Sequence, residues 1–217
     1  MRKLYTALMI CLFSIPCYAA SYTSPAIDLG VSVPKMCSMD MDIVEVPADS
    51  INPWGDGNQL APGSEMDFGE LVWSDDLGIW LAQKYFAIYL YPKTSGDKYS
   101  IKQTCYGFKS GSKDFTKSLT MTPQHWEQDH YAGQPAQGPL QPGESVGTAS
   151  LAVGSDIPVY TSNTGRARII RCDYGIYCAD PGAKDAGVLK TQGAKVVTGE
   201  QQAGPYSGVI TFTLVTM

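Results

Sequence analysis

The chain has 217 residues, of which 44% are hydrophobic and 17% are charged, and its formal net charge is −5. Charged residues are scarcer than the roughly 25% of an ordinary soluble domain, which argues against a disordered, coiled-coil or charge-solvated helical protein. The acidic balance also argues against nucleic-acid binding, which needs clustered Lys and Arg to neutralise phosphates. The length allows one or two domains and a core of decent size.

The first 19 residues have the features of a secretory signal peptide. Arg2 and Lys3 precede the apolar run 4–15, and small residues follow up to Ala19 and Ala20. The run is shorter than the roughly 20 residues that a helix needs to cross a bilayer. We therefore expect residues 1–19 to be removed and the mature chain to be exported without a transmembrane segment. Its formal charge would then be −7, with 14 bases and 21 acids.

Strand-like runs follow one another along the mature chain, and no stretch of a dozen residues keeps a helical period. The first run, Ala26–Val33, alternates apolar residues with polar or small ones, as a half-buried strand does. Clusters of Gly, Pro, Asn, Asp and Ser separate the later runs and predict turns. These runs are Met41–Val46, Met66–Trp73, Tyr85–Tyr91, Tyr99–Tyr106, Phe115–Thr122, Thr148–Val153, Pro158–Ser162, Arg168–Tyr174, Val188–Val197 and Tyr206–Val215. Many short strands with polar connections predict an all-β fold, an antiparallel β-sandwich.

Four cysteines remain once the signal peptide is removed: Cys37, Cys105, Cys172 and Cys178. In an exported chain such a set indicates disulfide bonds rather than zinc binding or thiol catalysis. Three pairings are open. We favour Cys37 with Cys105, which would join two distant strands, and Cys172 with Cys178, because the five residues between the last two would fit a tight loop.

No motif predicts catalysis, a metal site or a cofactor. The segment Gly143–Gly147 matches the G-x-S-x-G pattern of hydrolases, but that elbow needs a helix after Ser145 and a histidine further along the chain. Here a strand-like run follows, and both His125 and His130 precede the serine. The two histidines do not have zinc-protease spacing, and the acidic residues do not have the spacing of a calcium loop. We therefore predict a protein that is not an enzyme.

Charge is divided unevenly along the mature chain. Residues 20–83 contain 11 acids and one base, whereas residues 84–217 contain 13 bases and 10 acids. One interpretation is a solvated acidic face. The other is head-to-tail complementarity between copies of the chain, because a repeating heterologous contact needs two different surfaces.

The alternating run near the N-terminus allows two interpretations. Ile27, Leu29, Val31 and Val33 would project to one side of a strand. An extension with this pattern can add a strand to an incomplete sandwich in a neighbouring copy, where its alternate side chains fill pockets. The same residues would serve equally well as the first strand of their own domain.

Three segments of the chain resemble secreted fimbrial subunits of the chaperone–usher type, especially archaic pilins and the related spore coat protein U-like domains. The first is Cys37, which comes soon after the alternating N-terminal run. The second is the segment Met66–Leu71, and the third is the terminal stretch Ala203–Leu214, after which no strand is left to pair. A weaker similarity is Tyr174–Ile176 with the Pro-Gly turn that follows it.

This resemblance implies an immunoglobulin-like sandwich that lacks its last strand. In that family a periplasmic chaperone lends a strand, and assembly at an outer-membrane usher replaces it with the N-terminal extension of the next subunit. Residues 20–34 would then be the extension and residues 35–217 the pilin-like domain, with a bridge between Cys37 and Cys105 tying the first strand to the second. The donor-strand anchors would be Ile27, Leu29, Gly30, Val31 and Val33, and the edge of the acceptor groove would be Tyr206, Ile210, Phe212 and Leu214.

We therefore expect a structural subunit of an extracellular pilus or fibre, exported through the periplasm and assembled by donor-strand exchange. Its partners would be other copies or related subunits, a periplasmic chaperone and an outer-membrane usher, and its roles would include cell adhesion and biofilm formation. The alternative is a secreted β-sandwich that is complete by itself and acts as an adhesin or a glycan-binding protein.

Overall fold

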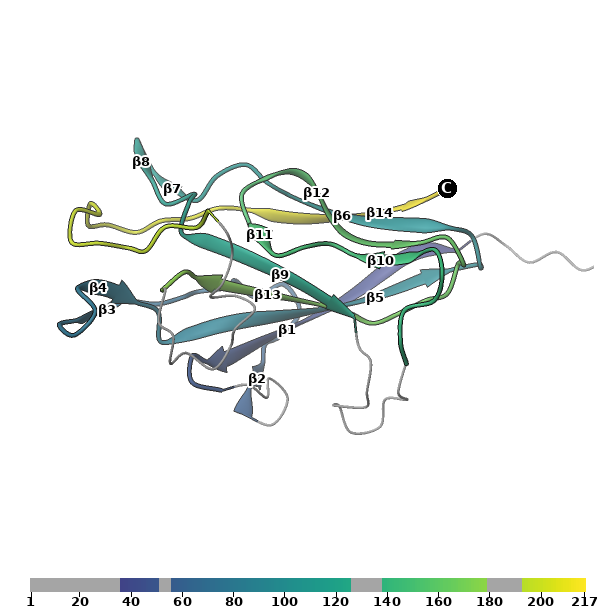
Figure 1. The fold of residues 1–217 in the computed structure, drawn as a ribbon, viewed down its shortest axis with the longest axis horizontal. Helices are drawn as coiled ribbons and strands as arrows, with labels where there is room; N and C mark the ends of the chain where they lie inside the picture. Colours follow the sequence, from purple (N-terminus) through teal and green to yellow (C-terminus); the bar gives the residue numbers. More distant parts are fainter. Residues whose placement is uncertain (1–35, 51–55, 126–137, 179–192) are drawn as a thin grey trace, which may run out of the picture. The chain divides into compact units, whose positions relative to one another are not determined.

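The computed structural model describes residues 36–50, 56–125, 138–178 and 193–217, all of which belong to one compact unit, Val33–Met217. They form two antiparallel β-sheets packed face to face (Figure 1), which confirms the predicted all-β sandwich. The predicted signal peptide, the alternating run Ala26–Val33 and His130 lie outside the described residues.

The larger sheet has six strands in the order β11-β9-β13-β5-β1-β2, and all its pairs are antiparallel. Its central strands are β13, β5 and β1, and β5 pairs with β1 over its full length. The strands in chain order are β1 (Cys37–Pro47), β2 (Asn58–Gln59), β5 (Lys84–Thr94), β9 (Leu119–His125), β11 (Ser150–Leu151) and β13 (Ile170–Ile176).

The smaller sheet has four strands in the order β10-β12-β6-β14, so that the last strand of the chain forms one of its edges. These strands are β6 (Tyr99–Cys105), β10 (Glu144–Val146), β12 (Gly154–Ser162) and β14 (Ile210–Thr216). Two short hairpins project from the sandwich (Figure 1). They are β3 (Val72–Ser74) with β4 (Ile79–Leu81), and β7 (Lys109–Ser110) with β8 (Lys113–Asp114).

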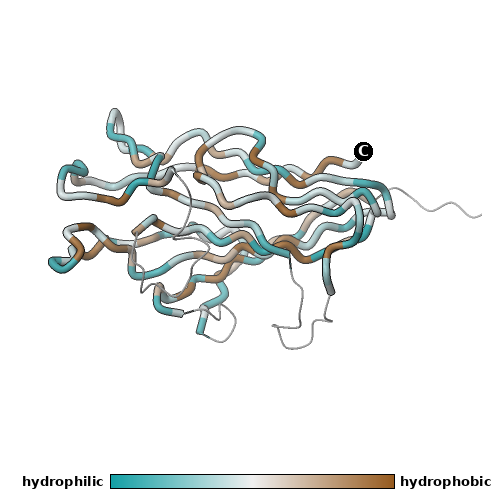
Figure 2. Tube along the Cα trace, in the orientation of Figure 1, coloured by the Kyte–Doolittle hydropathy of each residue, from teal (hydrophilic) through white to brown (hydrophobic). Residues whose placement is uncertain are grey.

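Alternate side chains of both sheets meet in the main core, as the period of two in a β-strand requires. In β6, for example, Tyr99, Ile101, Gln103 and Cys105 are all buried, and the residues between them are half-buried. The one long polar side chain in this row is satisfied across the core, because the hydroxyl of Tyr174 in β13 donates to Gln103 Oε1 at 2.6 Å. Figure 2 shows hydrophobic residues along the strands and hydrophilic ones gathered in the loops at the two ends.

The central strand β5 is buried on both faces from Tyr85 to Leu90, which explains why this run is continuously apolar. A second cluster of apolar residues lies on the face that points away from the main core. It consists of Val44, Val46, Tyr85, Ala87, Tyr89 and Ile169, with Tyr91 at its margin. On the neighbouring strand β13, Arg171 Nε donates to Asp173 Oδ1 at 2.8 Å, so that even the buried carboxylate of this strand has a partner.

Three predicted strands are much shorter than expected. Of Thr148–Val153, only Ser150 and Leu151 lie in a strand. Of Met66–Trp73, only Val72 and Trp73 lie in a strand, because Gly69 has a φ of +69° and breaks the extended chain. Of Val188–Val197, the described part begins at residue 193 and forms a single bridge, between Val197 and Trp80. That bridge ties the last of these segments to the hairpin of β3 and β4, because the N–H of Trp80 donates to the carbonyl oxygen of Val197 at 2.8 Å.

Candidate functional site: the open edge of β14

Within the described residues, the last strand, β14, pairs with a single neighbour, β6. Its register with β6 runs from Ile210 opposite Cys105 to Thr216 opposite Tyr99. On its other side, no strand within the described part of the chain pairs with it. We call this unpaired side of β14 the open edge. A strand of this kind presents a row of N–H and C=O groups that another extended segment can bind.

The side chains of β14 that point into the sandwich are only half-buried, although their neighbours on β6 are fully buried. Ile210, Phe212 and Leu214 all pack against the main core. The ring of Phe212 contacts that of Tyr174 edge-on, with 6.5 Å between the ring centroids. In a complete sandwich, neighbouring strands cover such a row of side chains on both sides. In this structure the partly exposed side chains of Ile210, Phe212 and Leu214 lie beside the open edge of β14.

The first half of β1 also has apolar side chains that are not fully covered, and it lies near β14. Met39 packs against the core and Met41, on the same face, is 43% exposed, whereas the next residue of that face, Ile43, is buried. β1 lies close to β14 where it begins, because Cys37 Sγ is 3.9 Å from the carbonyl oxygen of Leu214. The exposed apolar side chains of β1 and β14 therefore belong to the same side of the sandwich.

A turn before β14 fixes the position of that strand. Ser207 and Lys109 exchange two backbone hydrogen bonds, at 2.9 and 3.0 Å. Any Cβ on Gly208 would lie 1.9 Å from the carbonyl oxygen of Gly107, so only glycine fits there. Tyr206 packs its ring against Phe115 with 5.0 Å between centroids. Tyr206 thus anchors the turn, while the other three predicted edge residues, Ile210, Phe212 and Leu214, lie in β14 itself.

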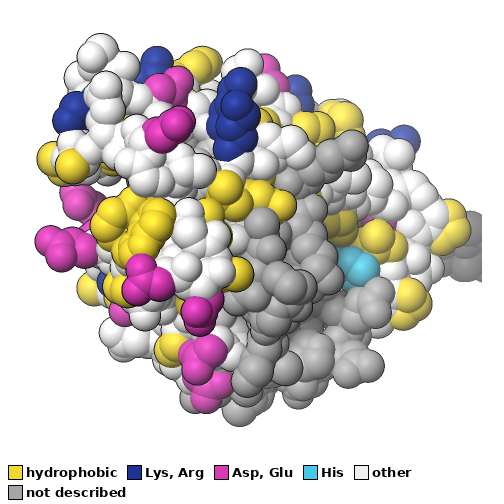
Figure 3. All heavy atoms as spheres, turned by 60° about the vertical axis from the view of Figure 1, so that its left-hand side comes forward, with side chains coloured by type: hydrophobic (Ala, Val, Ile, Leu, Met, Phe, Trp, Pro, Cys, Tyr) yellow, Lys and Arg dark blue, Asp and Glu magenta, His cyan; other side chains and the backbone are white. Residues whose placement is uncertain are grey.

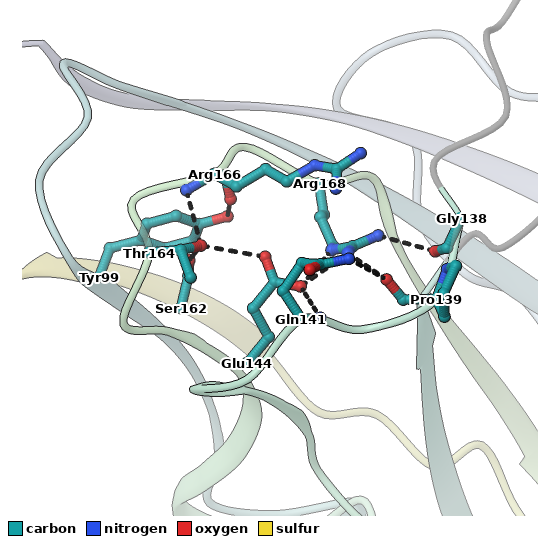
Figure 4. Close-up of polar contacts among 9 residues, drawn as sticks. All are labelled: Tyr99, Gly138, Pro139, Gln141, Glu144, Ser162, Thr164, Arg166 and Arg168. Carbon is teal, nitrogen blue, oxygen red and sulfur yellow. Dashed lines mark hydrogen bonds and ion pairs between the residues drawn. The ribbon is translucent and has the colours of Figure 1, made fainter.

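At the far end of β14 a buried ion pair holds the loops beside β6 (Figure 4). Arg168 donates through Nε to Glu144 Oε2 at 2.8 Å, and both side chains are fully buried. The same guanidinium donates to the carbonyl oxygens of Gly138 and Pro139, at 3.0 and 2.6 Å. Arg168, which directly precedes β13, therefore holds the loop before β10 in place. This loop covers the core at that end of the sandwich.

The environment of Glu144 stabilises its charged form. Burial alone would raise the pKa of this carboxyl, but hydrogen bonds from Arg168 and from the backbone N–H of Gln141 outweigh that effect and lower the pKa to about 2. Tyr99 lies next to this cluster, and its hydroxyl donates to the carbonyl oxygen of Arg166 at 2.9 Å. Since Tyr99 is the partner of Thr216 in the sheet, the cluster supports the end of the strand pair that carries the open edge.

The structure differs from the predicted disulfide bonds, because none of the four cysteines forms one. Cys172 lies inside β13, and the residues predicted to form a tight loop after it continue that strand to Ile176. Four residues of strand span about 13 Å, well beyond the roughly 7 Å that a disulfide allows between Cα atoms. The residues predicted to form a tight loop are therefore extended as far as Ile176, and Cys172 and Cys178 are not bonded to each other.

The first predicted bond fails for a similar reason. Cys37 lies beside Leu214, which is opposite Ile101 in β6, whereas Cys105 is four residues further along that strand. The two cysteines are therefore separated by most of the length of β6. Cys105 and Cys172 are small buried core side chains, and burial raises the pKa of both thiols.

The other residues singled out in the sequence do not come together. Ser145 lies in β10 opposite Thr161, so the strand–turn–helix geometry of a nucleophile elbow is not formed around it. His125 ends β9. No group of three or more potential metal ligands occurs among the residues that the structure describes. The predicted donor-strand anchors, Ile27, Leu29, Gly30, Val31 and Val33, lie outside those residues.

Two features of the site were not predicted from the sequence. The exposed Met41 was assigned to a strand, but nothing in its neighbourhood shows that one half of that strand lacks cover. Glu144 was seen only as part of the G-x-S-x-G motif, and its partner Arg168 is 24 residues away. Alternation identifies the face on which a side chain lies, whereas the element that covers this face depends on strand order.

Comparisons with known proteins give no match: no family model, no curated protein and no solved structure is similar to this chain. Within the described ranges, no helix is long and apolar enough to cross a membrane.

Proposed function

We propose that the protein is a structural subunit of an extracellular fibre, in which the N-terminal segment of one copy adds a strand along the open edge of the next. The observation that supports this most directly is the combination found at β14. This strand has an unpaired side, and its inward residues Ile210, Phe212 and Leu214 are half-buried beside it. The sandwich is then immunoglobulin-like and incomplete.

The N-terminal run has the pattern that such an edge would accept. Ile27, Leu29, Val31 and Val33 recur at every second position, as do the three inward residues of β14. Main-chain hydrogen bonds would supply affinity, and the aliphatic side chains would cover the exposed row. Burying four such side chains stabilises the contact by about 6 to 12 kcal/mol before the costs of ordering are subtracted.

An uncovered edge of this kind is a hazard in a free subunit, since unpaired strands recruit other chains without selectivity. The proposal therefore includes a periplasmic chaperone that covers the edge after export and an outer-membrane usher where the exchange takes place. The sequence features that support export are the charged and apolar first 19 residues. The role is structural, with no catalytic step.

The test is the formation of heat-resistant multimers by the full mature chain, read on denaturing gels before and after boiling. Leu29→Arg, in the apolar row, should abolish the ladder, whereas Ser32→Arg, in the polar row, should keep it. On the acceptor side, Leu214→Arg should act like Leu29→Arg, and the exposed Val215→Arg should act like the wild type. A wild-type chain that stays monomeric and stable without a chaperone contradicts the proposal.

A further inference from the structure

The end of the sandwich that carries both hairpins has two separate groups of charged residues. Figure 3 shows Lys and Arg side chains at the top of this end, with a few Asp and Glu side chains among them, and a second group of Asp and Glu side chains lower down, beyond hydrophobic side chains. We call the first group the basic patch and the second the acidic patch. The basic patch is formed by lysines on and beside the hairpin of β7 and β8, namely Lys109, Lys113, Lys117 and Lys195, with Asp114 among them. The acidic patch is formed by exposed acids of the segment before β3 and of the turn between β3 and β4, namely Glu65, Asp67, Glu70, Asp75 and Asp76.

Neither patch is fully neutralised within its own chain: Asp114 lies close enough to Lys109 and Lys117 to interact with them electrostatically, but the four lysines still leave an excess of positive charge. Elsewhere on the surface, opposite charges that come close do pair, as Lys84 does with Glu45 at 2.8 Å. None of the nine residues of the two patches forms an ion pair. Within the basic patch Lys113 donates to the carbonyl oxygen of Ala203, and within the acidic patch Asp75 accepts a hydrogen bond from Trp73 Nε1 at 3.0 Å. The acids of the acidic patch and the lysines of the basic patch therefore form no ion pair with each other in one copy.

Large apolar side chains lie within the acidic patch, on the hairpin of β3 and β4. Val72 is 51% exposed, Trp73 39% and Leu77 43%. The indole of Trp73 is held in place by an edge-on contact with Trp80, with 5.3 Å between ring centroids. A fixed, exposed aromatic side chain surrounded by charges is typical of the buried centre of a protein interface.

We infer that this end is a contact surface between two copies of the chain, in which the acidic patch of one copy faces the basic patch of the other and the hairpin with Trp73 is buried between them. The partner is a second copy of the chain because each copy carries both an acidic and a basic patch, and the two patches are complementary in charge. The contact joins the bodies of two copies and uses no residue of the N-terminal run. It is therefore independent of strand addition at β14 and would add to it in a fibre.

The first experiment is zero-length carbodiimide cross-linking of a mixture of ¹⁵N-labelled and unlabelled full mature chains. Carboxylates and amines in contact become amide bonds, and peptides that carry both labels identify bonds between copies. We expect such bonds between Asp75 or Asp76 and the lysines of the basic patch, and their loss in about 1 M salt, where charges are screened beyond roughly 3 Å. If these peptides carry only bonds within one copy, the inference is wrong.

Charge reversal gives the second test. Asp75→Lys with Asp76→Lys, and separately Lys109→Glu with Lys117→Glu, should each reduce cross-linking between copies at least about tenfold, because like charges then face each other. The chain with all four changes should regain it. Lys98→Glu with Asp156→Lys reverses exposed charges outside the two patches and should change nothing. Each variant is first shown to unfold at the wild-type urea concentration.

The two proposals fail in different ways. A heat-resistant ladder without these cross-links would leave strand addition in place and overturn the contact. Cross-links without a ladder would support the contact and overturn strand addition. A chain with all four reversals that folds but does not regain cross-linking also overturns the contact.

Discussion

The strands β13 and β14 have the same length, seven residues, and both begin with isoleucine, yet their surroundings differ. β13 lies between β5 and β9, and six of its seven residues are buried. β14 has one neighbour, and none of its residues is buried. Ile170 is completely buried, whereas Ile210 is half-exposed. The comparison shows that the number of neighbours, rather than the strand's own residues, decides how much of it is covered.

The outward-facing residues of the two strands differ in the same way. On β13, Arg171 and Asp173 point away from the main core and pair with each other. On β14, Thr211 and Thr213 are exposed and small. A central strand thus has to satisfy even its charges internally, while an edge strand can leave its outer face to solvent. Changes near β13 should therefore act on stability, and changes in β14 should act on assembly.

The largest effect is expected where the chain enters β13. Arg168→Ala would leave the buried carboxylate of Glu144 without its cation and lower the free energy of unfolding by about 3 to 5 kcal/mol. Lys98→Ala, at an exposed side chain next to Tyr99, is the control and should cost less than about 0.5 kcal/mol. Urea unfolding measures both. If both variants lose the same free energy of unfolding, the ion pair between Arg168 and Glu144 does not stabilise the fold.

The two isoleucines provide a direct comparison of the two strands. Ile170→Ala should cost about 2 to 5 kcal/mol because it opens a cavity in a covered core, and Ile210→Ala should cost less than half as much, since its side chain is half-exposed in the free subunit. Thermal or urea unfolding of the monomer measures both changes. In the assembled fibre the difference should shrink. Similar costs in the monomer would mean that the edge of β14 is covered in solution.

The pH dependence of stability should reflect Glu144. Its pKa is about 2 in the folded chain and 4.5 when unperturbed, so its ionisation contributes about 3 kcal/mol to stability above pH 4.5, and this contribution is lost as the pH falls through about 2. Glu144→Gln should therefore be less stable than the wild type at pH 6, and the gap should narrow at pH 2. Urea titrations at the two pH values measure this. A gap that is independent of pH would assign the loss to packing.

The smallest effect is expected from the hydrogen bond across the core. Tyr174→Phe would remove the donor to Gln103 Oε1 and lower the free energy of unfolding by about 1 to 3 kcal/mol, because a buried acceptor is left unsatisfied. Tyr106→Phe, at a side chain that is 80% exposed, is the control and should be neutral. A neutral Tyr174→Phe would indicate that water replaces the lost hydroxyl.

Particular elements show why some predictions from the sequence succeeded. Tyr85–Tyr91 and Tyr99–Tyr106 were placed within one to three residues of β5 and β6, because they are rich in aromatic and β-branched residues and are bounded by turn residues. The last strand was expected to begin at Tyr206 but begins at Ile210, since Tyr206 packs into the preceding turn. The short strands β2, β4, β7, β8 and β10 have no pattern long enough to be recognised.

The disulfide prediction failed because it used spacing along the chain. Five residues lie between Cys172 and Cys178, and a loop would bring the two cysteines together, but the residues up to Ile176 pair with β5 or β9 and remain extended. Similarly, Glu144 and Arg168 are far apart in sequence and meet only because the loop before β10 folds back over the start of β13.

The sequence by itself determined that this is an all-β chain, because alternation with a period of two and frequent turn residues are local properties that the backbone expresses wherever it lies. Only the tertiary structure decided which strand is left at an edge, which cysteines lie apart and which charges remain unpaired. All three depend on the order of the strands in the two sheets and on which loops meet at each end of the sandwich. That arrangement arises when the two sheets bury their apolar faces against each other, and no single segment of the sequence encodes it.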